Sequence, residues 1–584
     1  MIIYFSTTNP KTFQRQLFPK TKLPTILSSE LFQELTQIEN FDKKPYLFRV
    51  DINENKYSIF DKSEIQLSHK AYFNFIMDLA KTGQIESDTL FEYLDIETFR
   101  ALLAPSVEAD PKQPYIQFQD SLTGAACGKL VTTIKAAEEC IKRSEPFIIA
   151  IETLTPQILN IIKLADGFVT TKVGSTSHAA VIARGRQIPG LFISTDTKIT
   201  KTKLIYNNQI LNIFEDITID CNTKRLFAGR LNIHSTNQEI LDQFAHCIPK
   251  DISNKVFLNS ENPKEIEKAS HYGVKNIGLL RLEHLVLQTD LLNPFRILYL
   301  SDFLNLEELK VKFQQKFSIL LTARLKEISD SLRDSFVTIR LLDPPIHEFF
   351  DLKQDEIRKI AKTLKTPTKD VVDTIKLMAE KNPMMGNRGA RLMLQCDVLL
   401  TSQLDAIIEI IKLNTTKVKL EIPFVLNSKE AKLLINKIKA YLEKNAIKPD
   451  QYSLGIMFEI PSMLYSIEEI LGDIDFVSFG TNDLTQFTLG LSRDDNTKII
   501  DNYIQNNILT NSPFEVIDTD TVGEILKRAV KTIKAFNPKI QISVCGEHGG
   551  NYESIKFFKS IGINQVSCSA GRVMEAIFAM SKKD

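Results

Sequence analysis

The chain of 584 residues carries 72 basic and 72 acidic side chains, so its formal net charge at pH 7 is zero. This balance disfavours a broad polyanion-binding surface, and we expect no nucleic-acid partner. No stretch approaches the roughly 20 apolar residues of a membrane span, and the N-terminus lacks a signal-peptide pattern. The seven cysteines form no C-x-x-C pair, which disfavours zinc sites and disulfides and favours a reducing compartment. We therefore expect no membrane partner and a cytoplasmic location.

The first hundred residues predict a hairpin followed by helices. Side chains alternate over residues 46–60 and predict two strands that turn at 53–55. Residues 71–80 and 96–103 have the apolar spacing of amphipathic helices. No Gly-rich phosphate loop occurs in this part of the sequence, which disfavours a complete nucleotide-binding site here.

A Pro-rich stretch at 104–114 is typical of a linker and precedes a small α/β domain. Within that domain, helical stretches separate short β-rich runs at 147–151, 167–171 and 190–193. A polar stretch at 237–246 then predicts a helical connector.

From residue 256 the pattern changes to apolar runs separated by amphipathic stretches. In one such unit Asn262 predicts a helix cap, Pro263 the first helical position and Gly273 the helix end. Eight β/α units in succession predict a TIM barrel, with long insertions after the second and sixth strands. A doubly wound open sheet is the alternative. The eight candidate strands are 256–259, 276–280, 337–341, 419–424, 455–459, 476–479, 542–545 and 565–568.

The predicted fold class is therefore α/β, with a C-terminal (β/α)8 barrel, a small α/β domain before it and a short N-terminal α+β region. The predicted divisions are an N-terminal region at 1–67, a helical linker region at 68–112, the small domain at 113–230, the connector at 231–254 and the barrel at 255–584.

Polar side chains recur where the predicted barrel strands end, which is where TIM barrels carry their reactive residues. Each one alone has a structural explanation, such as a solvated rim arginine or an aspartate that caps a helix. Several at one mouth favour a functional site. These residues are Arg281, Arg340, Asp343, Glu459, Thr481, Asn482, Asp483 and Cys545, with Gly480 ahead of the Thr-Asn-Asp run.

The mouth residues suit one kind of chemistry. Two arginines bind a small dianion, because guanidinium forks match phosphate and carboxylate. Glu459 and Asp483 offer hard oxygen ligands that fit Mg²⁺ better than zinc. Cys545 can move a proton at carbon, although a cysteine at a strand end is more often a small buried apolar residue. Together they predict phosphoryl transfer from an enol phosphate with protonation of the enolate.

His178 follows a predicted strand and lies in the first turn of a helix that Thr176 or Ser177 can cap. The free N–H groups of a helix N-terminus favour an added phosphoryl group, so His178 can act as a nucleophile. From spacing alone, a purely structural histidine at the cap is equally consistent.

Several motifs make the chain similar to the phosphoenolpyruvate-utilising enzymes. Ser-Thr-Ser-His-Ala-Ala-Val-Ile-Ala-Arg-Gly at 175–185 closely resembles the phosphohistidine motif of that family. The wording of the motifs is nearest the pyruvate, phosphate dikinase branch and more distant from enzyme I of the sugar phosphotransferase system. The resemblance runs from about Ser68 to the C-terminus. The barrel motifs are Gly-Leu-Leu-Arg-Leu-Glu-His (278–284), Val-Thr-Ile-Arg-Leu-Leu-Asp-Pro-Pro-Ile-His-Glu-Phe (337–349), Asn-Pro-Met-Met-Gly-Asn-Arg-Gly (382–389), Phe-Gly-Thr-Asn-Asp-Leu-Thr-Gln (479–486), Ser-Arg-Asp-Asp (492–495) and Cys-Gly-Glu-His-Gly-Gly (545–550).

The resemblance implies a role for each matched position. It implies that phosphoenolpyruvate or pyruvate is the substrate, that Mg²⁺ is the cofactor, that the chain forms a homodimer through the barrel and that the small domain swivels. The implied roles are the phosphorylated residue for His178, the proton donor for Cys545, substrate binding for Arg281, Arg340 and Arg493, magnesium ligation for Glu459 and Asp483, and a substrate-gripping loop for Gly480, Thr481 and Asn482.

The sequence departs from the family pattern in three places. Val173 stands where a glycine is usual, and Leu282 replaces a threonine expected after Arg281. The third departure concerns the large ATP-binding region that a full dikinase carries ahead of the small domain. Here residues 1–67 hold at most a remnant of that region. The resemblance therefore implies a chain that does not bind ATP alone and works with a separate ATP-binding chain or without one.

Three functions follow as hypotheses. The first is the pyruvate/phosphoenolpyruvate half-reaction of a dikinase-like enzyme. The second is an enzyme I-like phosphotransferase that passes phosphate from His178 to a phosphocarrier protein. The third is a catalytically silent paralogue that binds phosphoenolpyruvate or a partner as a regulator, although each catalytic position holds a competent residue.

Overall fold

The computed structural model forms two compact units, Met1–Pro249 and Lys250–Asp584. None of the described helices is long and apolar enough to cross a membrane. The residues described are 2–5, 46–53, 56–64, 69–108, 113–122, 124–152, 158, 161–162, 164–171, 188–192, 194, 197–206, 209–234, 238–288, 290–332, 334–493 and 497–582.

The first unit begins with an antiparallel sheet of β1 (Ile2–Phe5), β2 (Tyr46–Asn53) and β3 (Lys56–Glu64). Because β2 and β3 pair from Asn53 with Lys56 outward, the predicted hairpin is confirmed. The next elements are four helices: α2 (His69–Lys81), α3 (Leu90–Tyr93), α4 (Ile96–Leu103) and α8 (Gln238–Ala245).

An aromatic cluster joins these four helices. Phe244 from α8 packs on Phe73, Phe91 and Phe99, with ring centroids 4.9 to 5.4 Å apart. All four rings are buried, so the predicted connector helix is fixed against the helices that begin at His69.

A mixed eight-stranded sheet forms the rest of the unit, in the order β5-β15-β14-β7-β8-β9-β10-β6. Its strands are β5 (Tyr115–Gln117), β6 (Asp120–Ser121), β7 (Ala125–Val131), β8 (Phe147–Ile151), β9 (Gly167–Thr170), β10 (Gly190–Phe192), β14 (Asp216–Asp220) and β15 (Arg225–Ala228), with α5 (Ile134–Arg143) against one face. Smaller pairings join β4 (Ser106–Glu108) to β16 (Asn232–His234) and β11 (Thr197–Ile199) to β12 (Lys203–Tyr206) and β13 (Gln209–Asn212).

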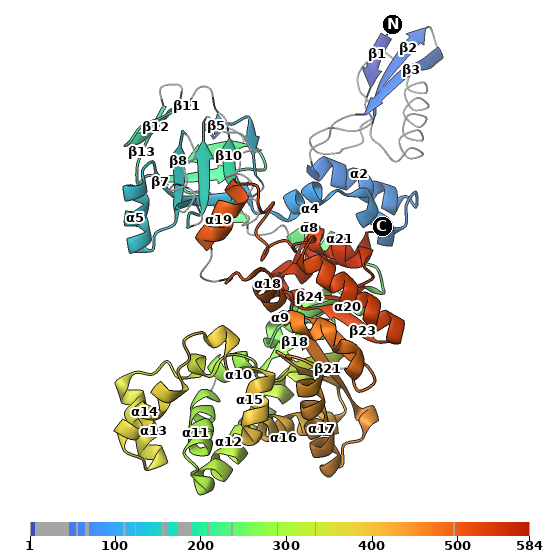
Figure 1. The fold of residues 1–584 in the computed structure, drawn as a ribbon. Coiled ribbons are helices and arrows are strands. Elements are labelled where there is room, and N and C mark those ends of the chain that lie inside the picture. Colours follow the sequence, from blue (N-terminus) through green and yellow to red (C-terminus); the bar gives the residue numbers. More distant parts are fainter. Residues whose placement is uncertain are drawn as a thin grey trace. The chain divides into compact units, whose positions relative to one another are not determined.

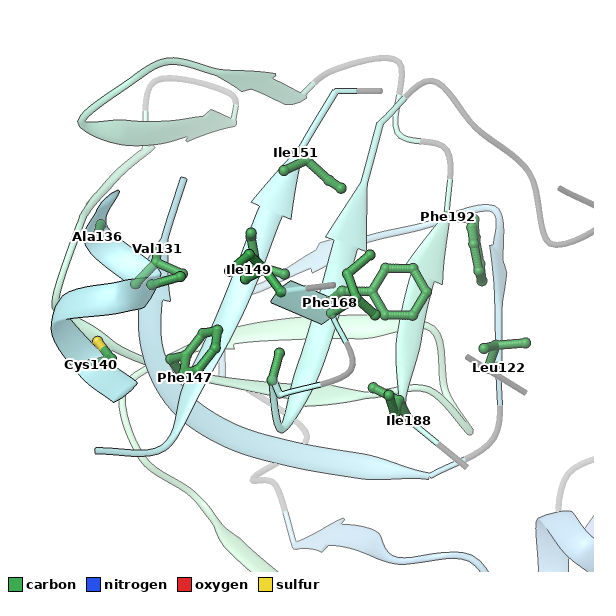
Figure 2. Close-up of a cluster of buried hydrophobic side chains, with 14 residues drawn as sticks. Leu122, Val131, Ala136, Cys140, Phe147, Ile149, Ile151, Phe168, Ile188 and Phe192 are labelled. Carbon is green, nitrogen blue, oxygen red and sulfur yellow. The ribbon is translucent and has the colours of Figure 1, made fainter. Parts of the chain in front are cut away.

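The central strand β8 shows why this sheet is covered on both faces. Its sequence, Phe-Ile-Ile-Ala-Ile, is apolar throughout, which is typical of a parallel strand with no solvated face. Phe147, Ile149 and Ile151 join the α5 side with Phe168, as Figure 2 shows, and Ile148 points to the opposite cluster.

The second unit is a closed parallel barrel in which each strand pairs with the next and β17 pairs with β24, so the predicted TIM barrel is confirmed (Figure 1). Each of the eight candidate strands corresponds to one observed strand. They are β17 (Val256–Asn259), β18 (Ile277–Arg281), β19 (Phe336–Arg340), β20 (Lys417–Ile422), β21 (Tyr452–Phe458), β22 (Phe476–Phe479), β23 (Gln541–Val544) and β24 (Val566–Ser569).

The connections correct one prediction. Insertions follow the second and sixth strands as expected, but the longest connection, residues 341–416, follows the third strand. Its helices alternate without a β-rich run, so no strand signal marked it. The barrel helices are α9 (Pro263–His271), α10 (Leu282–Gln288), α11 (Leu292–Phe303), α12 (Glu307–Asp330), α13 (Gln354–Leu364), α14 (Thr368–Met378), α15 (Ala390–Gln395), α16 (Asp397–Leu413), α17 (Ser428–Lys444), α18 (Thr481–Leu489), α19 (Thr497–Gln505), α20 (Val522–Phe536), α21 (Tyr552–Ser560) and α22 (Val573–Ser581).

The helix start and helix end predicted for the first β/α unit are both observed. The Asn262 side chain accepts a hydrogen bond from the backbone N–H of Lys264, and Pro263 begins α9. Gly273 follows the helix with a φ of 77°, a left-handed conformation that glycine adopts without strain.

Gly455 gives a test of barrel packing. A Cβ at this position in β21 would lie 2.5 Å from the backbone oxygen of Phe476, which cannot move without shifting β22. We expect Gly455→Ala to lower the melting temperature of the barrel, whereas Gly472→Ala leaves it unchanged because the nearest atom there is 3.9 Å away. Calorimetry of both variants checks this, and equal melting temperatures would contradict the packing described.

Candidate active site

Two arginines lie side by side at the carboxyl ends of neighbouring strands. Arg281 ends β18 and Arg340 ends β19, and the two residues are partners in the strand register. Arg340 is buried, and its guanidinium contacts Glu283 and lies 3.1 Å from the Asp343 carboxylate. Its Nε has no hydrogen-bond partner among the described residues. A buried donor of this kind is open to an oxygen of a bound anion.

Asp343 joins Arg340 to a third arginine, Arg388. The Asp343 carboxylate lies 2.6 Å from Arg388 Nη2, and the same nitrogen donates to Asp483 at 3.0 Å. Burial acts to raise the pKa of Asp343, but the charges of Arg340 and Arg388 outweigh it and lower that pKa. The Arg388 guanidinium also stacks over the Phe424 ring at 4.2 Å. The loops after β19 and β22 are thereby tied together.

Glu459 follows β21 and is buried beside this network. Its Oε1 accepts a hydrogen bond from the backbone N–H of Phe424 at 2.5 Å. Burial, followed by the charges of Asp343 and Asp483, raises the pKa of Glu459 well above its ordinary value. Gly480 leaves room for this carboxylate, since a Cβ there would lie 2.7 Å from Glu459 Oε2.

The donor set fits a hard divalent cation. Glu459 and Asp483 provide carboxylate oxygens, and a cation beside Glu459 would favour the ionised form that burial disfavours. Within the described residues there is no group of three or more potential His, Cys, Asp or Glu ligands. The pair therefore suits Mg²⁺, which takes one or two carboxylates and fills its other positions with water and substrate oxygens.

Thr481 and Asn482 connect the loop after β22 to the loop after β23. The buried His548 accepts a hydrogen bond at Nδ1 from the Thr481 hydroxyl (2.8 Å) and donates from Nε2 to the Pro513 carbonyl (2.9 Å). The carbonyl partner assigns the proton to Nε2. Asn482 Oδ1 accepts from the Glu547 N–H at 3.1 Å. These contacts hold the start of α18 against the segment that follows Cys545.

Cys545 follows β23 and lies in the barrel interior with Leu279 and Met457. Its Sγ is 3.3 Å from the Ser478 hydroxyl and 3.5 Å from the Phe479 carbonyl oxygen. Burial, and then the charge of Glu421, raise the pKa of the Cys545 thiol. Cys545 is therefore protonated at neutral pH, as a proton donor to carbon must be.

The structure brings most of the predicted mouth residues to one end of the barrel, although their functional roles stay predictions. Arg493 is exposed, and its backbone N–H donates to the Gln486 side chain. Leu282 is fully buried at the start of α10. His178 and Val173 lie outside the described residues. The residues at this end are Arg281, Arg340, Asp343, Glu459, Gly480, Thr481, Asn482, Asp483 and Cys545.

Arg388, Glu283 and Glu421 are functional candidates that the sequence patterns did not indicate. Arg388 and Glu283 belong to motifs that resemble the family's, and a strand-end rule does not find them because neither ends a strand. Glu421 lies within the fourth predicted strand, 419–424, and is its only acidic residue. A carboxylate between apolar neighbours in a barrel strand was the signal that could have found it.

The fold and the charged mouth place the chain in the class of (β/α)8-barrel proteins that carry reactive groups at the carboxyl ends of their strands. Two family profiles match the chain: "PEP-utilising enzyme, PEP-binding domain" over residues 236–584 and "PEP-utilising enzyme, mobile domain" over residues 143–224. The chain belongs to the phosphoenolpyruvate-utilising enzyme family.

Curated relatives carry the name pyruvate, phosphate dikinase. The Rickettsia typhi protein is 30% identical over 95% of this chain and 64% of its own length. The Clostridium symbiosum protein is 29% identical over 86% of this chain and 59% of its own length. Pyruvate, phosphate dikinase 2 of Oryza sativa is 28% identical over 95% of this chain and 64% of its own length. The chain thus spans less than two thirds of the length of these relatives.

His548 makes the stability of the barrel depend on pH. Burial lowers the pKa of His548 from 6.5 to about 4. Between these two pH values the histidine is protonated in the unfolded chain and neutral in the native chain. Stability therefore falls as pH drops through that window, by up to about 3 kcal/mol.

We expect His548→Gln to reduce the loss of melting temperature between pH 6.5 and pH 4. The exposed His271 on α9 provides the control, since His271→Gln should keep the full loss. Calorimetry across this pH range measures both, and an undiminished loss in His548→Gln would assign the dependence to other groups.

Proposed function

We propose that this chain transfers a phosphoryl group between phosphoenolpyruvate and His178, as the pyruvate/phosphoenolpyruvate half-reaction of a dikinase-like enzyme. One observation carries the proposal. Arginines, paired carboxylates and a buried protonated cysteine meet at one end of the barrel of a family member. These groups match the three demands of the reaction: binding a dianion, stabilising an enolate and protonating its carbon.

The arginines bind the substrate anion in this proposal. Arg281 and Arg340 lie in register at the strand ends, and the Nε of Arg340, which has no partner among the described residues, offers a donor to a phosphate or carboxylate oxygen. Asp343 holds Arg340 and Arg388 in place, so their positions are set before substrate arrives. Preorganised charges stabilise a transition state without the cost of reorganising at the moment of reaction.

Cys545 completes the reaction at carbon. Transfer of the phosphoryl group breaks the bond from phosphorus to the enol oxygen and leaves an enolate. The Cys545 S–H proton then goes to C3 of the enolate, which becomes the methyl group of pyruvate. Because burial keeps the thiol protonated, Cys545 holds this proton until the enolate forms. The reverse direction removes the proton from the methyl group.

Glu459 and Asp483 would hold Mg²⁺, which when bound supplies Lewis-acid stabilisation of the enolate oxygen. Gly480, Thr481 and Asn482 shape the adjoining loop, and Arg493 is proposed as a further anion contact. The proposal includes a homodimer through the barrel, a cytoplasmic location and a swivelling phosphohistidine domain at 113–230 that carries His178 between sites.

Phosphorylation of His178 is the direct test. We expect the full chain, given Mg²⁺ and phosphoenolpyruvate labelled at phosphorus, to take up acid-labile label that His178→Ala abolishes. His271→Ala, on the exposed face of α9, should label normally. An unlabelled wild-type chain would support the silent regulatory paralogue instead. Transfer of the label to a small carrier protein, rather than to nucleotide with a partner chain, would favour the enzyme I-like alternative.

Metal binding provides an independent test. The His178→Ala variant is used with phosphoenolpyruvate present, because it cannot consume this substrate. Mn²⁺ replaces Mg²⁺, and electron paramagnetic resonance measures how tightly Mn²⁺ binds. We expect Glu459→Gln to weaken Mn²⁺ binding by tenfold or more, because changing even a residue that only supports the metal ligands typically has an effect of about this size. Glu575→Gln is the matched control, because it makes the same substitution at a buried glutamate on α22. Unchanged Mn²⁺ affinity in Glu459→Gln would remove Glu459 from the proposed ligands.

A further inference from the structure

The barrel interior below Cys545 carries charged groups that the proposed reaction does not use. Lys419 in β20 donates a hydrogen bond to the Gln541 side chain in β23. These strands are not neighbours, since β21 and β22 lie between them, so the contact crosses the interior. Glu421 is two residues further along β20 and faces the same side as Lys419. A carboxyl group therefore lies inside the barrel, nearer the mouth than Lys419.

Glu421 is fully buried, and neither of its carboxyl oxygens has a hydrogen-bond partner among the described residues. A buried carboxyl without a partner opposes folding, and an apolar side chain of similar size would fill the same space without that penalty. Packing alone thus gives no reason for a glutamate at this position.

Ser478 lies between this carboxyl group and the thiol. Its hydroxyl is 3.3 Å from Cys545 Sγ. It is also close enough to the Glu421 carboxyl to lower the pKa of that group, although the geometry falls short of a hydrogen bond. Ser478 thus interacts with the Cys545 thiol on one side and with the Glu421 carboxyl group on the other.

The charges around Glu421 keep it poised between its two forms. Burial raises the pKa of Glu421 to about 7, against the opposing effects of Ser478, Arg340 and Lys419. Asp343 acts in the same direction as burial. Glu421 in turn raises the pKa of Cys545. A carboxylate and a thiolate therefore disfavour each other here, so the ionised form of one group favours the protonated form of the other.

We propose that Glu421 and Ser478 form a proton relay that restores the proton of Cys545 each time Cys545 has protonated the enolate. The inference rests on the proposed function and adds two positioning residues to it. As the Cys545 S–H bond breaks, a C–H bond forms at C3 of the enolate. The Ser478 hydroxyl then gives its proton to Sγ and takes the proton of the Glu421 carboxyl group. In the reverse direction each proton moves the other way.

The lower end of the barrel supplies the proton that Glu421 loses. A cavity of about 570 Å³ lies at the amino ends of the strands, and Lys419 and Gln541 line it together with Lys275, Lys417 and Lys539. Burial lowers the pKa of Lys419 to about 8, so this ammonium can release and recover a proton close to neutral pH. Solvent in the cavity replaces that proton, and the balance over one turnover is one proton taken from water.

The test compares Glu421→Gln with the wild-type chain. The amide keeps the size of the side chain and removes its titration. With Mg²⁺, phosphoenolpyruvate and pyruvate in D₂O the half-reaction runs in both directions, and we expect solvent deuterium to enter the pyruvate methyl group on the order of 100-fold more slowly, a typical contribution of a proton-transfer group. The pH profile of deuterium entry should lose its step near neutrality, while exchange of carbon label between pyruvate and phosphoenolpyruvate, which needs no new proton on Cys545, and the amount of label on His178 stay the same. Glu421→Asp, which still titrates, should recover part of the rate.

Ser478→Ala should slow deuterium entry to a similar extent, and the double variant should be no slower than either single one, because both remove the same relay. Glu575→Gln, buried on α22, is the matched control and should leave rate and pH profile unchanged. Should Glu421→Gln fail to fold, Ser478→Ala carries the test.

The outcomes separate the two proposals. A wild-type chain that labels His178, with a Glu421→Gln variant of unchanged rate and pH profile, overturns the relay and leaves the proposed function standing. A wild-type chain that does not label His178 overturns both. Carbon exchange that falls in Glu421→Gln as much as deuterium entry does would assign Glu421 a structural role and would also overturn the relay.

Discussion

Asp343 is buried between Arg340 and Arg388, and the arrangement of the barrel mouth depends on this shared ion pair. A buried charge is tolerated only with partners, and removing one partner of such a group leaves the others uncompensated. Arg388 also reaches Asp483, so the pairing extends from the loop after β19 to the loop after β22. The positions of the two arginines, and of the carboxylates proposed to hold a metal ion, are thus set by one electrostatic network.

The closed barrel makes that network possible. All eight strands are parallel, so their carboxyl ends lie on one rim, and residues as far apart in the chain as Arg281 and Cys545 reach the same mouth. The interior adds a second set of polar groups below the rim. Lys419, Glu421 and Ser478 lie in a space that barrels normally fill with branched apolar side chains. The proposed chemistry at the mouth and the proposed proton supply from below share Cys545.

Much of the architecture was predictable because its signals are local. Apolar runs marked each barrel strand, the alternation at 46–60 marked the hairpin, and Asn262 with Pro263 marked the start of α9. The insertion after the third strand was missed, since a series of helices carries no sign of which strand it follows. Arg388 was missed as well, because it reaches Asp343 and Asp483 only through the folding of that insertion over the mouth.

The sequence by itself determined the fold class, the order of the strands and the chemical types gathered at their ends, since periodicity and short motifs are properties of neighbouring residues. Only the tertiary structure decided which of those groups meet and in what state. The raised pKa of Glu459 and the lowered pKa of His548 both come chiefly from burial, and they depend on atoms contributed by distant segments. The carboxyl group of Glu421, which has no hydrogen-bond partner in the described part of the chain, likewise has its pKa raised chiefly by burial. Desolvation and charge pairing act through space, so no window of the sequence contains them.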